Sequence, residues 1–131
     1  MSFIKKTLKK ELEPKINEFK TQLDDFIDKC SDDNILNKMF TEIYLLRIEL
    51  DKKDSFIQNV KDYIKRNKVY DKKALIKLQF EDIIDNYYNY EKDQLNRFNE
   101  IMSIILPNNN KAKNILKEIW ENICKAIDVM G

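Results

Sequence analysis

Glycine is almost absent from this chain, and that absence narrows the folds open to it. The only glycine in 131 residues is Gly131, and there are two prolines, Pro14 and Pro107. A loop that wraps around a phosphate depends on glycine's backbone freedom, so the sequence contains no such loop. No stretch alternates apolar and polar residues over the length of a strand, so no strand is predicted. Apolar residues still make up 43% of the chain, enough to build a core. The sequence therefore predicts an all-α fold in a single domain, residues 1–131.

Apolar residues recur three and four positions apart in four long stretches, which is the spacing of amphipathic helices. Clusters of Ser, Asp and Asn, or proline followed by asparagines, separate these stretches and favour turns. Short connections between long helices favour antiparallel neighbours, so we predict an up-down-up-down four-helix bundle. The predicted turns lie near residues 31–34, 66–71 and 107–110.

Two positions leave alternatives open within this bundle. Pro14 interrupts the first helix, which is either kinked there or split into a short helix 2–12 and a second helix from residue 14. The second helix either runs unbroken over about 34–66 or breaks at the cap-forming pair Asp54-Ser55. Asp71 is expected to cap the helix that follows it. The residues expected in the core are Phe19, Leu23, Phe40, Ile43, Leu46, Ile84, Phe98, Met102, Ile119, Trp120 and Ile123.

Two apolar runs, at 43–48 and 101–106, are wider than one helix stripe, because successive residues on a helix point about 100° apart. Either a central helix buries two of its sides, or these runs form a docking surface for a partner or a second copy of the chain. Tyrosines that point away from the core phase are typical of protein interfaces and can stack on bases, or they pack in the ordinary way with the hydroxyl in water. The predicted interface residues are Tyr44, Leu45, Ile48, Tyr88, Tyr90, Ile104 and Leu106.

The formal net charge is only +1, but charges cluster along the sequence. An up-down bundle with four helices would bring the start of the first helix next to the second connection. The resulting basic pole would hold Lys5, Lys6, Lys9, Lys10, Lys61, Lys65, Arg66, Lys68, Lys72 and Lys73. Such a pole could contact nucleic-acid phosphates, an anionic surface or an acidic protein, or it is simply solvated. Residues 3–12 also form a basic amphipathic segment, able to lie on a membrane surface or to dock on the bundle itself.

Candidate chemistry is sparse because the chain has no histidine. Asp24-Asp25-Phe26-Ile27-Asp28 resembles the DDxxD magnesium box of class I terpenoid synthases over these five residues alone. Glu81, Asp82 and Asp85 resemble the one-turn carboxylate spacing of all-α nucleotide pyrophosphohydrolases, which need a second facing acidic pair. We interpret both motifs as solvated helix faces. The sequence therefore predicts no catalytic residue, no metal site and no cofactor.

These observations favour a non-enzymatic helical protein that binds another protein, as a regulator, inhibitor, immunity-type protein or subunit of a complex. The alternative is a nucleic-acid-associated subunit that uses the basic pole on backbone phosphates. The first residues lack the continuous apolar run of a secretory signal, and Cys30 and Cys124 fall inside helical patterns. A cytoplasmic location with reduced thiols is expected.

Overall fold

The computed structural model describes the backbone of residues 3–86, 90, 92–105 and 111–130, and most of their side chains. Over these ranges the secondary structure is helical, as the sequence predicts. The six helices are α1 (Phe3–Lys29), α2 (Asp33–Glu49), α3 (Lys53–Asn67), α4 (Lys72–Asp85), α5 (Lys92–Ile105) and α6 (Lys111–Met130). The prediction of an all-α fold is confirmed, and the prediction of four helices is wrong.

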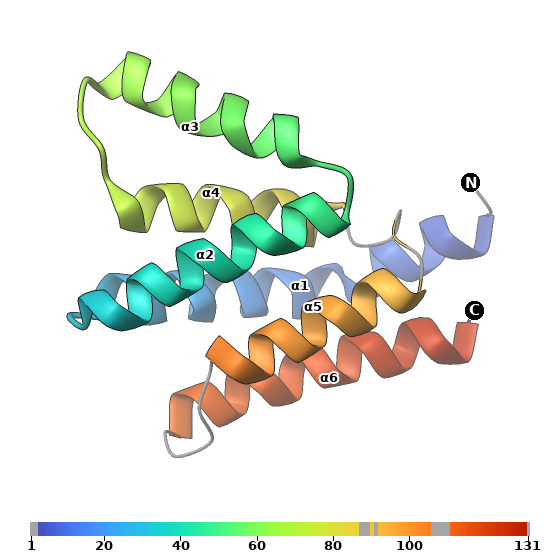
Figure 1. Ribbon diagram of the computed structural model, residues 1–131. Coiled ribbons are helices and arrows are strands. Elements are labelled where there is room, and N and C mark those ends of the chain that lie inside the picture. Colours follow the sequence, from blue (N-terminus) through green and yellow to red (C-terminus); the bar gives the residue numbers. More distant parts are fainter. Residues whose placement is uncertain (1–2, 87–89, 91, 106–110, 131) are drawn as a thin grey trace.

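Five of these helices surround one core, and the sixth lies outside them. α1 packs against α4 and α6, α5 packs against α6 and α2, and α2 packs against α4, which closes a ring. α3 packs on the outside, against α2 and α4. Successive helices run back and forth, so the start of α1 and the end of α6 lie at the same end of the molecule, and α3 and α6 lie on opposite sides (Figure 1).

The predicted second helix is divided into α2 and α3 by a turn at residues 50–52. Asp51 adopts the left-handed conformation with φ 61°. The Asp51 and Lys52 N–H groups donate back to the Ile48 and Arg47 carbonyls, at 3.1 and 2.8 Å. These two bonds form the Schellman motif that usually carries glycine at its left-handed residue. An aspartate in that place hides the turn from the sequence, and the alternative break at Asp54-Ser55 is also misplaced.

The predicted third helix is likewise divided, because α4 ends at Asp85 and α5 begins at Lys92. The turns flanking α2 and α4 agree better with the sequence. Asp32 caps α2 by accepting hydrogen bonds from the Asn34 and Ile35 N–H groups, at 2.9 and 3.4 Å. Asp71 caps α4 by accepting from the Ala74 N–H at 3.3 Å, as predicted.

Pro14 does not split the first helix, because α1 continues on both sides of it, and a kink there is not confirmed. Pro14 and Lys10, whose carbonyl loses its helical donor, are both exposed, while Leu12 and Ile16 are buried. The unpaired carbonyl therefore falls on the side where water can replace the missing N–H donor.

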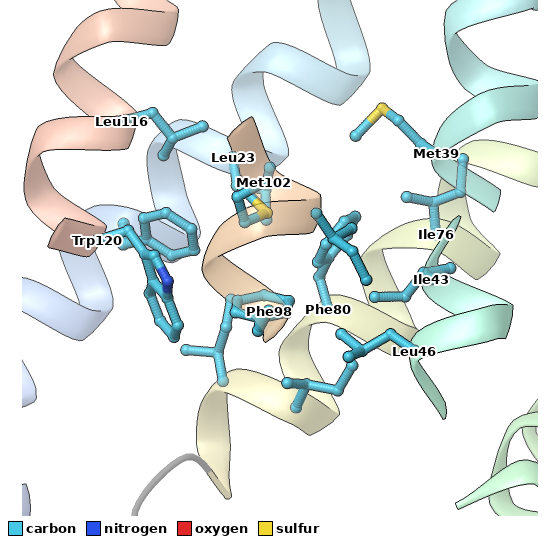
Figure 2. Packing of buried hydrophobic residues seen from close by; sticks show 14 of the residues in the cluster. Leu23, Met39, Ile43, Leu46, Ile76, Phe80, Phe98, Met102, Leu116 and Trp120 are labelled. Atoms are coloured by element: carbon cyan, nitrogen blue, oxygen red, sulfur yellow. The ribbon is translucent and has the colours of Figure 1, made fainter. Parts of the chain in front are cut away.

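Aromatic side chains from α1, α4, α5 and α6 form the centre of the core (Figure 2). The Trp120 ring lies 4.6 Å from the Phe98 ring and 5.2 Å from the Phe19 ring, between centroids, and Phe80 lies 6.1 Å from Phe98. Of the predicted core residues, all are buried except Phe40 and Ile119, which are half-buried against the edge of the core. Phe40 lies at the boundary with α3, where a helix outside the ring covers it only in part.

Candidate functional site

Most of the exposed large apolar side chains belong to two helices that pack together, α2 and α3, and to the connection after α3. In the part of the chain that the structure describes, seven large hydrophobic side chains are exposed, and five of them belong to α2, α3 or the connection after α3. We call this surface the α2–α3 face. Its exposed members are Leu45, Ile48, Ile64, Val69 and Tyr70, with exposed fractions of 43, 41, 38, 54 and 50%.

A row of ring contacts joins the half-buried aromatic residues of α2 to Tyr70, which follows α3. The Tyr44 ring lies 5.0 Å from Phe56, Phe56 lies 5.4 Å from Phe40, and Phe40 lies 6.3 Å from Tyr70, between centroids. Phe56 is buried, while Phe40 and Tyr44 are half-buried. Ile48 follows Tyr44 by one helical turn, so it continues the row on α2. The apolar side chains of α2 are therefore linked to exposed Tyr70 through the buried Phe56 ring.

The structure separates the predicted interface residues. Leu45 and Ile48 are exposed, whereas Tyr44 packs on Phe56 and is half-buried. Tyr90 is half-buried against the core, and burial raises the pKa of its hydroxyl, opposed by the charge of Arg47. Ile104 belongs to α5, but its side chain lies outside what the structure describes, as do Tyr88 and Leu106 altogether.

The predicted basic pole does not form. Lys73 Nζ donates to the Asp28 carbonyl at 2.9 Å, and Lys72 Nζ contacts Asn37, so both lie where α1 ends and α2 begins. Lys5 and Lys10 lie near the start of α1, a helix of 27 residues that spans about 40 Å at 1.5 Å per residue. The extra turn at Asp51 reverses the direction of the chain, so α3 ends at the opposite end of the molecule (Figure 1). The lysines at 61–73 therefore lie at a different end of the molecule from those at 5–10. The side chains of Lys5, Lys6 and Lys9 lie outside what the structure describes.

The two acidic motifs of the sequence face each other across α1 and α4. Lys20 Nζ lies 2.8 Å from the Asp85 carboxylate, and Lys77 pairs with Asp28. Between these two ion pairs, the carboxyl groups of Asp24 and Glu81 interact directly. Because α1 and α4 run antiparallel, positions four residues apart on each helix meet in three successive pairs.

The central pair of this ladder holds two like charges. Burial raises the pKa of Asp24 and also that of Glu81, and the Asp24 charge raises the pKa of Glu81 further. The hydrogen bond between the two groups raises the pKa of Glu81 and lowers that of Asp24, so it opposes the effect of burial on Asp24 alone. Lys20 and Lys77 already neutralise the outer carboxylates. Among the described side chains, no three Cys, Asp or Glu residues are arranged to hold a metal ion.

We expect Glu81→Gln to stabilise the protein at neutral pH, by roughly 0.5 kcal/mol, because it removes one of two like charges from a partly buried pair. A raised pKa means that the folded state binds protons more tightly than the unfolded chain. When the pH falls through these raised pKa values, the carboxyl pair takes up a proton and the like-charge repulsion is relieved, so the wild-type protein becomes more stable. The difference in free energy of unfolding between Glu81→Gln and the wild-type protein should therefore shrink at lower pH. Urea unfolding at neutral pH and at about pH 5 measures this difference.

The matched control for that experiment is Glu118→Gln, at an exposed position on α6. An equal gain from both substitutions would show that the effect comes from net charge and not from the Asp24–Glu81 contact.

Two buried polar side chains, Arg47 and Gln79, both 0% exposed, could not be recognised from the sequence. Arg47 Nη1 donates to Asp82 Oδ2 at 2.5 Å, while its Nε and Nη2 have no hydrogen-bond partner among the described residues. The same holds for both amide atoms of Gln79. Within this turn of α2, the charged residue Arg47 is buried, whereas the apolar residues Leu45 and Ile48 are exposed. A helical pattern that counts apolar residues cannot reveal such an inversion.

An apolar cleft of about 600 Å³ lies where α1 ends and α2 and α6 begin, lined by Phe26, Cys30, Ile35 and Leu116 among others. The charged groups at its rim are already engaged. Asp25 pairs with Lys29 at 3.0 Å, Asp32 caps α2, and Lys113 Nζ lies 5.0 Å from the centre of the Phe26 ring. We therefore assign no ligand to this cleft.

No protein family, curated protein or solved structure matches this chain. The assignment of a function therefore rests on the chain's own residues. Within the described residues, no helix combines the length and the apolarity needed to cross a bilayer.

Proposed function

We propose that this protein is not an enzyme and that it acts by binding another protein through the α2–α3 face. The observation that carries the proposal is the concentration of exposed apolar side chains there, five of the seven in the described part of the chain. Single exposed apolar residues are ordinary, whereas a contiguous patch is typical of an interaction surface. The regulator, inhibitor, immunity-type and subunit roles all use such a surface.

The composition of the α2–α3 face suits a protein partner. Tyrosine is enriched in protein interfaces, and both Tyr44 and Tyr70 belong to this face. Cys30 is a free, buried thiol, which accords with the reducing cytoplasm that the proposal assumes. The alternative function, in which a basic pole contacts nucleic-acid phosphates, loses its main support because the pole is divided between two ends of the molecule.

We expect Leu45→Ser combined with Ile48→Ser to abolish association with the partner, while the melting temperature changes little. Both side chains are already about two-fifths exposed, so the folded state loses little apolar burial when they become polar. Quantitative affinity co-purification from the native host measures the association, and circular dichroism follows thermal unfolding. The control is Ile115→Ser, which changes an equally exposed isoleucine on α6.

Two results would contradict the proposal. If the double variant unfolds, these residues stabilise the core and are not an interface. If Ile115→Ser reduces association equally, the binding does not depend on the α2–α3 face. Sedimentation of the purified protein shows whether the partner is a second copy of the chain.

A further inference from the structure

Lysines lie on both sides of Ile64, the exposed apolar residue of α3 that belongs to the α2–α3 face. Positions three and four residues apart are neighbours on a helix. Ile64 therefore has Lys61 and Lys68 beside it, one on each side along the helix, and Lys65 follows Lys61 by one turn. All three lysines are exposed. Val69 and Tyr70 come directly after Lys68, so the same positive charges border the exposed end of the α2–α3 face.

These lysines differ from those at the contact between α1 and α4. Lys20 and Lys77 form ion pairs with aspartates, and Lys72 and Lys73 contact polar groups of α2 and α1. Within the described residues, the side chains of Lys61, Lys65 and Lys68 take part in no hydrogen bond or ion pair. Their charge is therefore left for a group outside the chain.

We propose that the partner of the α2–α3 face presents an apolar surface bordered by Asp and Glu side chains, which contact Lys61, Lys65 and Lys68. This inference rests on the proposed function. Apolar contact with Ile64, Val69 and Tyr70 supplies affinity, and the opposite charges select the partner and accelerate the encounter. The acidic groups belong at the end of the face where α3 meets its connection to α4.

A protein fits this charge distribution better than an anionic membrane or a nucleic acid. The other side of α3 forms a groove of about 360 Å³ with α4, and the groove is lined by Asp62, Glu81, Asp82 and Asp85 with a single cation, Arg66. Asp85 and Asp82 are paired with Lys20 and Arg47, but Asp62 forms no ion pair within the described residues, so its charge would repel a broad anionic surface lying against this side of α3. A protein can confine its acidic residues to the lysine side.

The test uses two synthetic amphipathic helical peptides as probes, one of leucine and glutamate and one with lysine in place of every glutamate. Binding to the full-length protein is measured by calorimetry at low and high salt. The variant carries Lys61→Gln, Lys65→Gln and Lys68→Asn, since asparagine tolerates the left-handed conformation of Lys68 at φ 55°. The control removes the same charge at exposed lysines elsewhere, with Lys15→Gln, Lys111→Gln and Lys125→Gln.

We expect the glutamate peptide to bind the wild-type protein and the control equally, and the α3 variant about tenfold more weakly, with the difference shrinking at high salt. Preference for the lysine peptide, equal weakening in the control, or no binding of the glutamate peptide would overturn the inference. So would α3-dependent binding to phosphatidylserine vesicles without binding of the glutamate peptide, which would indicate a membrane surface. The Leu45→Ser and Ile48→Ser experiment does not depend on charge, so it separates failure of this inference from failure of the proposed function.

Discussion

Trp120→Ala is expected to lower the free energy of unfolding by about 3–5 kcal/mol, the usual cost of removing a large buried aromatic side chain. Trp120 is 0% exposed and its ring contacts Phe19 of α1 and Phe98 of α5. The resulting cavity would lie where three helices of the ring meet, so the neighbouring side chains could fill it only in part. Urea unfolding followed by circular dichroism measures the loss.

Trp120→Phe serves as the control, because it keeps an aromatic ring in the core and removes an indole N–H that has no hydrogen-bond partner in the described part of the chain. Its cost should be clearly smaller than that of the alanine variant. A loss below about 1 kcal/mol for Trp120→Ala would show that the core is not centred on this side chain.

Asp82→Ala should also destabilise the protein strongly, by about 2–3 kcal/mol. Arg47 is fully buried, and Asp82 is the acceptor to which its Nη1 donates. Removing the carboxylate leaves a buried positive charge without compensation. The expected cost is at the low end for a buried pair, because the Asp82 side chain is 43% exposed and water can enter.

The comparison that tests this explanation is Arg47→Met, alone and together with Asp82→Ala. Methionine fills much of the same space without a charge, so the single Arg47→Met variant should cost less than Asp82→Ala. In the Arg47→Met background, Asp82→Ala should have little further effect. An unchanged cost of Asp82→Ala in that background would show that Asp82 acts through other contacts.

The helical secondary structure and most of the core residues could be predicted from the sequence, because both follow from the spacing of apolar residues along the chain. The capping role of Asp71 and the burial of Phe98 follow from single residues and from a 3.6-residue period. The turn at Asp51 could not be predicted in the same way. It places a non-glycine residue in the left-handed region, and the apolar spacing continues across it with no change of phase.

That one missed turn had a consequence beyond its own position. An additional reversal of the chain at Asp51 moves the residues that follow it to the other end of the molecule. The predicted basic pole was therefore wrong, because its two groups of basic residues lie at different ends. The face around Leu45 and Ile48 was predicted because wide apolar runs are visible in a sequence. Ile64 was missed because it was expected on the core side of a longer helix, and Val69 and Tyr70 were missed because they were expected in the turn at 66–71.

The most direct test of a protein-binding α2–α3 face is photo-crosslinking in the native host, with benzoylphenylalanine introduced at Ile64 and, separately, at Ile115. The two positions are 38% and 40% exposed and belong to α3 and α6, on opposite sides of the molecule. We predict one discrete adduct from position 64, joined to another protein at an apolar segment rich in Asp and Glu, and no such adduct from position 115. The same adduct from both positions, or none from position 64, would contradict the assignment of this face as the binding surface.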